Sequence, residues 1–513
     1  MSVSVETFTT GLVLVPLIVW QAFHRHPEYS VEIAAMLSGC AVLSLLYFLK
    51  TRKLRQTSQN GVPIVDGGVP ILGHGLAFNN SPDGFLLECR RRYGSAFTLN
   101  LAGSITVVLD GIHGQDFFKA PDRVLSFKEA ALRFLVPEFT VGRDSITNDF
   151  HTGLVRREFN ENNVGDFAQH FEEYLQHCFQ EDLGLKHKGE IKQVGDLERL
   201  AWRSIAYCSA RSFMGPELCT DPEVLDVFIH FNKHCGLLIN LNNVTPRWAL
   251  RFLAASCAKD TATIAKIIIP EIQRRKLEEQ PERAGSTGVR SDLLSSLMAC
   301  KDRDGHAYSP EYLGKRMMTL IFSSMVTTAG ALTQVLYDIA GRREYWDRLY
   351  QEQATALAQT GGKLTKATLE TVPFLTAFIR ESMRMGSLPV QQARYCLQDT
   401  EVAGYHVPAG TTVVISGVLT AFNETFFKDP STFNPGRFLD DTGAAIIPKG
   451  FFPFGEGRHV CPGRHFAMSE IKTVAIMLMQ NYDFRTASGK RPAYNYMPGD
   501  VTVVQEPVQF EKK

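Results

Sequence analysis

The chain has 513 residues, of which 44% are hydrophobic, and a formal net charge of zero. This length can bury a large core, and a prior of roughly 150 residues per domain would allow about three domains, although no linker divides the chain. The neutral charge argues against a nucleic-acid partner. The ten cysteines form no C-x-x-C pair and no zinc-type cluster with histidine, which indicates reduced thiols and a cytosol-facing protein.

Two apolar runs lie near the N-terminus, at residues 11–23 and 33–49. The second run is near the lower length limit for a membrane-spanning helix, and the basic cluster that follows it at 50–55 is expected to stay cytoplasmic. No clear cleavage site follows the first run, so a removed signal peptide is not favoured. We therefore expect residues 1–55 to form a membrane anchor of one or two hydrophobic helices; the alternative is that both runs are core helices.

A segment rich in proline and glycine follows the anchor. Such a composition predicts a stiff, turning connector, and residues 56–75 are interpreted as a hinge. The remainder, residues 76–513, is interpreted as a single catalytic domain.

The catalytic domain is predicted to be mainly α-helical with a minor β region. In chain order, the expected elements are a helix at 85–93, strands at 96–101 and 105–109, a helical region from 162 to 380 with long amphipathic runs at 167–179 and 313–340, strands at 394–397, 402–411 and 412–415, a helix at 463–481, and short strands after 483. A segment at 280–291, rich in Glu, Arg, Gly and Ser, is the best candidate for a mobile loop.

One cysteine has an unusual setting, in the stretch FFPFGEGRHVCPGRHFA at residues 451–467. Cys461 lies in a glycine-rich loop with basic residues on both sides, and Pro462 fits the start of a helix. The free N–H groups and the dipole of a helix N-terminus stabilise a thiolate. The pattern therefore predicts that Cys461 binds a ligand or acts as a nucleophile.

The segment from Phe454 to Gly463 resembles the haem-binding loop of the cytochrome P450 superfamily, which reads aromatic, small, any, Gly, any, basic, any, Cys, any, Gly. The resemblance implies a haem (iron protoporphyrin IX) whose axial iron ligand is the thiolate of Cys461. The basic place, usually arginine, is His459; either His459 or the adjacent Arg458 is expected to contact a haem propionate, and Phe454 to contact the cofactor. Taken alone, the loop could also be a structural turn with a buried cysteine.

A second element of the resemblance is a pair of charged residues on one helical face. Glu381 and Arg384 are three residues apart, a spacing that brings helical side chains together. Residues 433–438 resemble the family's meander motif, which implies that Arg437 completes a buried structural network with them. The other basic residues that the resemblance places against the haem are Arg394, Arg156 and Arg157.

The predicted long helix contains a segment, 320–330, that resembles the family's oxygen-activating segment. The resemblance implies that Thr327 and Thr328 are catalytic. In monooxygenases of the family, a threonine hydroxyl and nearby waters transfer protons to the iron-bound peroxide, and an acidic side chain usually supplies these protons. Valine, at position 326, replaces that acid. Some members without the acid still oxygenate, while others rearrange peroxides without a reductant, so both readings stay open. Both threonines could also simply bond back to a helix carbonyl.

The substrate pocket is expected to be apolar, which suits a lipophilic substrate near a membrane. The loop at 128–143 and the Arg-His-x-Cys sequence of the cysteine loop resemble the sterol-demethylase branch of the family. Similar sequences also occur among fungal, terpenoid-tailoring members. This implies a sterol, triterpenoid or other terpenoid of secondary metabolism. The candidate pocket residues are Phe134, Leu135, Phe139, Ser323, Leu388 and Val390, although all could equally be ordinary core residues.

The resemblance thus implies a microsomal haem-thiolate monooxygenase, anchored in the endoplasmic reticulum membrane with its catalytic domain facing the cytosol. Electrons are expected from NADPH through NADPH-cytochrome P450 reductase, which would dock near Lys449, Arg458 and Arg464. One alternative is a haem-thiolate isomerase or dehydratase that acts on a peroxide substrate without a reductase. Another is a haem-based sensor or carrier.

Overall fold

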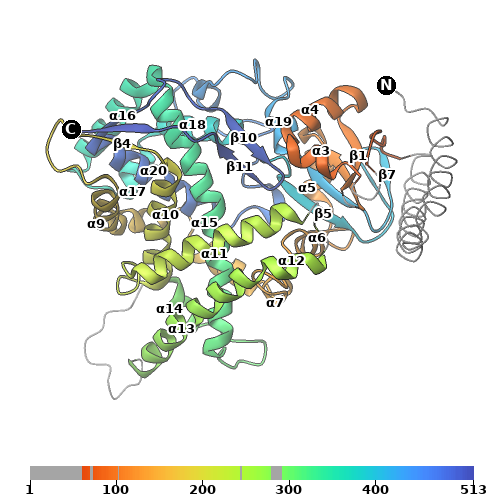
Figure 1. Cartoon of the computed structure of the whole chain (residues 1–513), viewed down its shortest axis with the longest axis horizontal. Helices are drawn as coiled ribbons and strands as arrows, with labels where there is room; N and C mark the ends of the chain where they lie inside the picture. The colour runs from red at the N-terminus through yellow and green to blue at the C-terminus, as the bar shows by residue number, and fades with distance from the viewer. Residues whose placement is uncertain (1–60, 70–72, 102, 243–244, 246, 279–291) are drawn as a thin grey trace, which may run out of the picture.

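The computed structural model describes residues 61–69, 73–101, 103–242, 245, 247–278 and 292–513. Over these residues the chain forms a body in which helices dominate; β1, β5 and β7 lie towards one end, β10 and β11 near the middle and β4 at the other end (Figure 1). The prediction of a mainly α fold with a minor β region is confirmed. The expected anchor at 1–55 and the expected mobile loop at 280–291 lie outside the described residues.

The first half of the chain contributes a run of helices that ends just before the longest one. These helices are α3 (Gly75–Asn80), α4 (Pro82–Tyr93), α5 (Gly114–Lys119), α6 (Phe127–Phe134), α7 (Asp144–Thr147), α8 (Phe150–Glu158), α9 (Val164–Leu183), α10 (Leu197–Met214), α11 (Pro222–Leu241), α12 (Arg247–Leu253), α13 (Ala255–Glu278) and α14 (Leu293–Met298).

The later helices begin with the longest, α15. They are α15 (Pro310–Gly341), α16 (Trp346–Gln359), α17 (Lys366–Glu370), α18 (Pro373–Met385), α19 (Gly417–Ala421) and α20 (Arg464–Asn481). Short 3₁₀ turns occur at η3 (Gly111–His113), η4 (Arg343–Tyr345), η5 (Pro435–Phe438) and η6 (Gly457–His459).

Among the described residues the strands form one five-stranded sheet and three smaller sheets. The five-stranded sheet has the order β1 (Ala96–Leu101), β2 (Ser104–Leu109), β8 (Thr412–Ile415), β5 (Gln392–Cys396) and β3 (Leu125–Ser126). The smaller sheets are β4 (Ile191–Val194) with β12 (Val508–Lys512) and β9 (Tyr482–Thr486), the hairpin β6 (Thr400–Val402) with β7 (Tyr405–Val407), and the hairpin β10 (Tyr494–Met497) with β11 (Asp500–Val503). Only β2 and β8 pair in parallel within the described sheets.

One predicted strand is wrong. Residues 402–411 do not form a single strand, because the chain turns between β6 and β7 at Ala403 and Gly404, whose φ angles are 57° and 77°. Two successive residues with positive φ are typical of a tight hairpin turn, and glycine adopts that conformation without strain. The strand expected at 412–415 is present as β8, and the helix α19 begins just after it at Gly417, with Ser416 as its side-chain cap.

The part of the predicted hinge that the structure describes is tied to the body. The N–H of Val65 donates to the carbonyl of Thr98 (3.0 Å), and the N–H of Thr98 donates to the carbonyl of Pro63 (2.7 Å). Val65 is also buried, in a hydrophobic cluster that includes Phe97 and Leu99 of β1. This segment therefore extends the edge of β1.

The central helix α15 runs through the core and positions the site described below. Its start is fixed by Pro310 in the first turn and by Ser309, whose side chain accepts a hydrogen bond from the N–H of Tyr312. In the described part of the chain, α15 is the one helix long and apolar enough to cross a membrane. Its packing against α10, α11, α13 and α18 instead identifies it as a core helix (Figure 1).

Candidate active site

The cysteine loop is held in shape by its backbone and its glycines. The N–H of Cys461 donates to the carbonyl of Phe454 (2.8 Å), which closes the loop just before α20 begins. Gly455 and Gly457 have φ angles of 70° and 68°, a region that disfavours side chains. A Cβ at Gly455 would lie 1.7 Å from Nε2 of Gln392, so a larger residue there would displace the side chain of Gln392 on β5.

The thiol of Cys461 is half-buried, two residues before the cap of α20. Burial raises its pKa, while the N–H of Gly463 and the charge of Arg464 act in the opposite direction. Because burial is the larger effect, the fold alone favours the neutral thiol, contrary to the thiolate expected from a helix N-terminus. A metal ion bound to the sulfur would reverse this preference, since a coordinating thiol is deprotonated.

Arg394, on β5, is a buried cation without a carboxylate partner among the described residues. Its guanidinium donates to the carbonyl of Ala393 (3.0 Å) and to Oε1 of Gln392 (3.1 Å), and it lies 5.0 Å and 5.2 Å from the ring centres of Phe117 and Phe127. Burial lowers its pKa to about 10. A buried charge requires an opposite charge to offset its desolvation, so the side chain is suited to an anion supplied by a cofactor.

His459 lies next to this cation but is engaged by a residue that the sequence did not indicate. Its Nε2 is 2.7 Å from Oδ1 of Asp122, and its ring stacks on Phe127 with centroids 5.0 Å apart. Burial lowers the pKa of His459, with the hydrogen bond to Asp122 acting in the opposite direction and the charge of Arg394 acting in the same direction. The bond to Asp122 orients the imidazole beside the cysteine loop.

The other predicted basic contacts are at the surface. The side chain of Arg458 is exposed, and its carbonyl accepts a hydrogen bond from Arg156 of α8 (2.9 Å). Arg157 is exposed and pairs with Glu158. The structure thus brings Arg156 to the cysteine loop and leaves the guanidinium of Arg458 in solvent.

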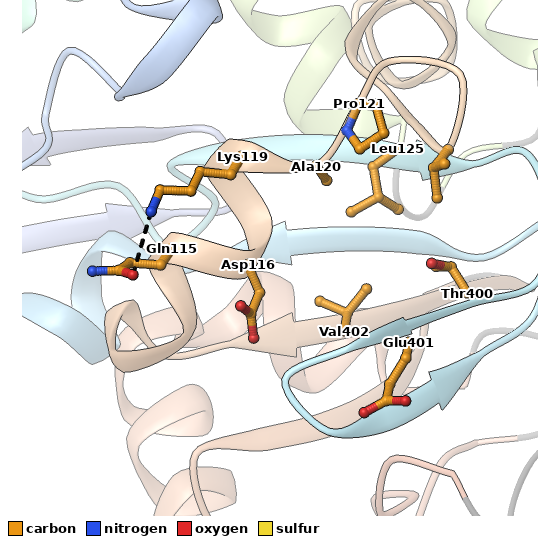
Figure 2. A pocket seen from close by; sticks show the side chains of 10 residues that line it. Gln115, Asp116, Lys119, Ala120, Pro121, Leu125, Thr400, Glu401 and Val402 are labelled. Atoms are coloured by element: carbon orange, nitrogen blue, oxygen red, sulfur yellow. Dashed lines mark hydrogen bonds between the residues drawn. The ribbon is translucent and has the colours of Figure 1, made fainter.

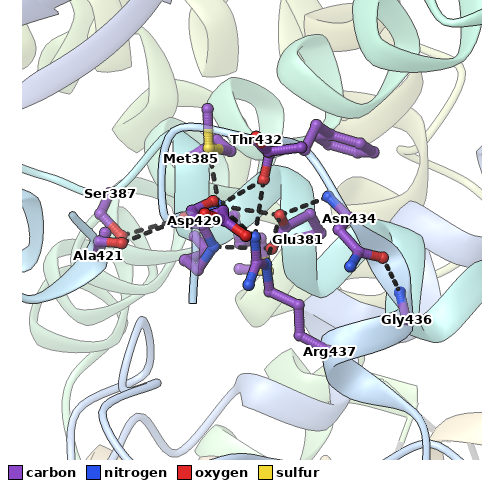
Figure 3. A network of polar contacts seen from close by, with 12 residues as sticks. Glu381, Met385, Ser387, Ala421, Asp429, Thr432, Asn434, Gly436 and Arg437 are labelled. Atoms are coloured by element: carbon purple, nitrogen blue, oxygen red, sulfur yellow. Dashed lines mark hydrogen bonds and ion pairs between the residues drawn. The ribbon is translucent and has the colours of Figure 1, made fainter. Parts of the chain in front are cut away.

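The structure joins the three charged residues of the predicted network (Figure 3). Glu381 and Arg384 are almost completely buried and form two hydrogen bonds of 2.7 Å and 2.9 Å. Nε of Arg437 donates to the same carboxylate (3.2 Å), as does the backbone N–H of Asn434 (2.7 Å). The network therefore fastens α18 to the segment that leads into the cysteine loop.

On α15, two hydroxyl side chains one turn apart are exposed although the helix runs through the core. They are Ser323 and Thr327, whereas Thr328 is buried. The hydroxyl of Ser323 donates to the carbonyl of Thr319 (2.7 Å), but that of Thr327 has no hydrogen-bond partner within the described chain. Val326 is half-buried against the core. The hydroxyl of Thr327 is therefore accessible and available to a ligand or water.

The predicted pocket residues do not share one environment. The ring of Phe134 reaches the tip of the β10–β11 hairpin, where it would lie 3.4 Å from a Cβ on Gly499. Leu135 and Leu388 are half-buried. Phe139 packs on the large hydrophobic cluster around α15, and Val390 packs on the smaller cluster that contains residues of β1 and β2.

A separate surface cleft of about 380 Å³ lies between α5 and the β6–β7 hairpin (Figure 2). Its lining includes Asp116 and Lys119 on one side and Glu401 on the other. Neither the cysteine loop nor α15 contributes to the lining, so this cleft is distinct from the candidate site.

Two acidic residues of the site were missed by sequence reasoning. Asp122 joins His459 across 337 positions of the sequence. Asp500, at the start of β11, lies against α15 near Gly330. Neither stands in a motif, so nothing in the linear pattern signals its place.

Several known proteins are similar to this chain over most of its length. The family model described as "Cytochrome P450" matches residues 63–511. The chain is 26% identical over 468 residues to lanosterol 14-alpha demethylase of Cunninghamella elegans, with 85% of this chain and 88% of the relative covered. It is 25% identical to cytochrome P450 monooxygenase 103 of Postia placenta (92% and 97% covered) and 26% identical to cytochrome P450 monooxygenase olcJ of Penicillium canescens (81% and 80% covered).

Among solved structures, the chain is similar to retinoic acid-bound cyanobacterial CYP120A1. The TM-score is 0.72 at 21% identity, with 89% of this chain and 100% of the other covered. At this identity the likeness concerns the fold.

Proposed function

This chain belongs to the cytochrome P450 family, and we propose that it is a membrane-anchored monooxygenase that inserts one oxygen atom of O₂ into a lipophilic substrate of the sterol or terpenoid type. Enzymes of this family carry a thiolate-ligated haem, with electrons supplied by NADPH through a reductase. The observation that carries the assignment is the meeting of two features at one place. A half-buried cysteine stands in a closed glycine loop, and Gln392, which lies against Gly455 of that loop, accepts a hydrogen bond from Arg394. Arg394 is a buried cation that has no ion-pair partner among the described residues.

These residues fit the cofactor by their chemistry. The sulfur of Cys461 is the iron ligand, and Arg394 and His459 are suited to a haem propionate, with Asp122 holding the imidazole in place. Phe454 closes the loop through its carbonyl. When bound, the haem supplies the redox chemistry that activates O₂.

The residues of α15 act on the substrate side. The hydroxyl of Thr327 is accessible and can hold or pass a proton at Oγ1. Val326 contributes no proton, so water in contact with Thr327 or with the neighbouring serine hydroxyls supplies it. Thr328 is buried on a different face of the helix and supports packing.

The substrate class is inferred from the relatives and from the site together. Several of the similar proteins are named lanosterol 14-alpha demethylase, and others are fungal monooxygenases. The fungal relatives and the apolar residues expected near α15 support a sterol, a triterpenoid or another terpenoid. The same relatives support a location in the endoplasmic reticulum membrane, with a reductase docking near the exposed Lys449 and Arg458.

A second candidate function is motivated by Val326. A haem-thiolate isomerase or dehydratase would act on a peroxide already present in the substrate and would need no reductase. Turnover in the absence of NADPH and reductase would favour this reading, whereas strict dependence on both would exclude it.

The test of the assignment is Cys461→Ala in the full-length protein, with Cys300→Ala as the matched control. Both are half-buried free thiols, but Cys300 lies outside the site. We expect the first variant to lose the thiolate-type spectrum with carbon monoxide and all turnover, and the control to keep both. An intact thiolate-type spectrum in Cys461→Ala would refute the assignment.

A further inference from the structure

The tip of the β10–β11 hairpin is a meeting point of three elements. The two strands are joined by a two-residue turn, with Met497 paired to Asp500. The N–H of Gly499 donates to Oδ1 of Asn240 (3.1 Å), the penultimate residue of α11. A Cβ on Gly499 would lie 3.4 Å from the ring of Phe134 at the end of α6. The hairpin tip therefore packs closely between the ends of α6 and α11.

The next residue, Asp500, faces the central helix. Its Oδ1 is 3.8 Å from the position of a Cβ on Gly330, and outside α15 no other described atom lies within 4 Å of that position. Gly330 is three residues after Thr327, a spacing that places the two on the same side of a helix. The amide of Gln334, one turn further along, fixes the strand by donating to the carbonyl of Val501 (2.8 Å). Asp500 is thus held beside the face of α15 that carries the accessible Thr327.

The carboxylate of Asp500 is poorly satisfied by the protein. Within the described chain, the hydrogen bond that it accepts comes from the N–H of the adjacent Val501 (2.7 Å), and no Arg, Lys or His forms an ion pair with it. The side chain is still partly accessible. Burial raises its pKa to about 6, and the charge of Glu198 on α10 acts in the same direction. The carboxyl group is thus largely desolvated, partly accessible and without an ion-pair partner in the described chain.

We propose that the carboxylate of Asp500 binds a hydrogen-bond-donating group, a hydroxyl or an ammonium, on an otherwise lipophilic substrate. The proposal rests on the proposed function, because it takes the substrate to occupy the space beside Thr327. A desolvated carboxylate without an ion-pair partner is costly, and a donor on the ligand removes that cost. Such an anchor at one end of a lipophilic molecule also fixes which carbon is presented at the other end.

The geometry explains why the carboxylate is available to a ligand. Gly330 has no side chain to cover it, and Gly499 allows the hairpin tip to reach α6 and α11 without a clash. The hydrogen bond from the amide of Gln334 to the carbonyl of Val501 fixes the backbone of β11 next to Asp500. The site is therefore organised before the substrate binds, which lowers the entropic cost of recognition.

Retention of matched lipophilic probes by the full-length holoprotein tests the proposal. The probes are farnesol, cedrol and cholestan-3β-ol, each with its methyl ether, which accepts but does not donate a hydrogen bond, and with the corresponding primary amine. After equilibration in detergent and gel filtration, the retained compound is measured by mass spectrometry. Asp500→Leu removes the carboxylate, Asp500→Asn keeps its shape, and Asp441→Leu, at an exposed acid of the loop before the cysteine loop, is the control.

We expect the wild type and Asp441→Leu to retain at least one alcohol or amine about tenfold better than its methyl ether, and Asp500→Leu to lose that preference. In Asp500→Asn the preference for an alcohol should fall partly and that for an amine should vanish, which distinguishes a hydroxyl from an ammonium. Amines can also bind the iron. For amines, the relevant quantity is therefore the retention by wild type that is lost in Asp500→Leu. The carbon monoxide spectrum of each variant checks its fold, and Asp500→Asn decides the question if the leucine variant is unstable.

Three results would overturn the proposal. The first is a wild type that retains no alcohol or amine better than its ether. The second is an unchanged preference in Asp500→Leu. The third is an unchanged preference accompanied by NADPH use without product in Asp500→Asn, which would assign the carboxyl to proton delivery instead. Retention needs no NADPH, so a donor preference without any turnover would contradict the proposed function and leave this inference standing.

Discussion

The buried ion pair between Glu381 and Arg384 makes the sharpest stability prediction. Glu381 is fully buried and accepts two hydrogen bonds from Arg384, one from the N–H of Asn434 and one from Arg437. Arg384→Leu removes the first two and leaves the carboxylate with one cation. Breaking a buried pair in this way costs about 3–5 kcal/mol, and the remaining bond to Arg437 places the expected loss near the lower end, at about 3 kcal/mol.

The chain contains a matched control for this experiment. Glu88 and Arg91 have the same spacing of three residues and similar distances of 2.7 Å and 2.8 Å, and Glu88 also keeps a second arginine, Arg92. Their side chains are, however, 40% and 71% exposed. Solvent screens an exposed pair, so Arg91→Leu should change the free energy of unfolding little.

The assay is urea unfolding of the full-length holoprotein, followed by far-ultraviolet circular dichroism and by haem absorbance. We expect a clearly lower midpoint for Arg384→Leu at an unchanged slope, and almost no shift for Arg91→Leu. Because the network fastens α18 to the segment before the cysteine loop, haem absorbance should be lost together with the helical signal. Equal shifts in the two variants would refute the argument that burial sets the cost.

The remaining predictions concern the site. Thr327→Ala should lower product formed per NADPH several-fold, while Thr328→Ala, at a buried position, should change it little; equal coupling in both variants would show that water alone delivers the protons. Arg394→Leu should weaken haem retention by about 10- to 100-fold in transfer to apomyoglobin, since a hydrogen bond to a charged group contributes about 1.5–3 kcal/mol, and a larger effect of Arg458→Leu would move the propionate contact to that residue. Burial raises the pKa of Asp500 to about 6, above its unfolded value, so its contribution to stability is full below the unfolded pKa and is lost as the pH rises through about 6. The free energy of unfolding of Asp500→Asn should therefore rise relative to wild type from about pH 4 to about pH 8, and a constant difference in denaturant titrations would contradict the desolvation of this carboxyl.

Short-range spacing explains what could be predicted. The glycines and the cysteine of the loop act within ten residues, and Glu381 and Arg384 meet because they are three residues apart on one helix. The amphipathic run predicted at 313–340 likewise depends on local spacing, and α15 follows it closely at Pro310–Gly341. The hairpin at Ala403 and Gly404 was misread because an alternating pattern does not reveal a turn whose first residue is alanine.

The sequence by itself determined the family, the haem-thiolate chemistry and the mainly helical fold, because these depend on motifs whose residues are neighbours along the chain. Only the tertiary structure decided that Asp122 holds His459, that Arg394 is buried without a carboxylate partner in the described chain, and that Asp500 faces Gly330. These contacts join residues that are far apart in sequence. The desolvation that gives each group its chemistry arises from the elements packed around it, and no linear spacing records that packing.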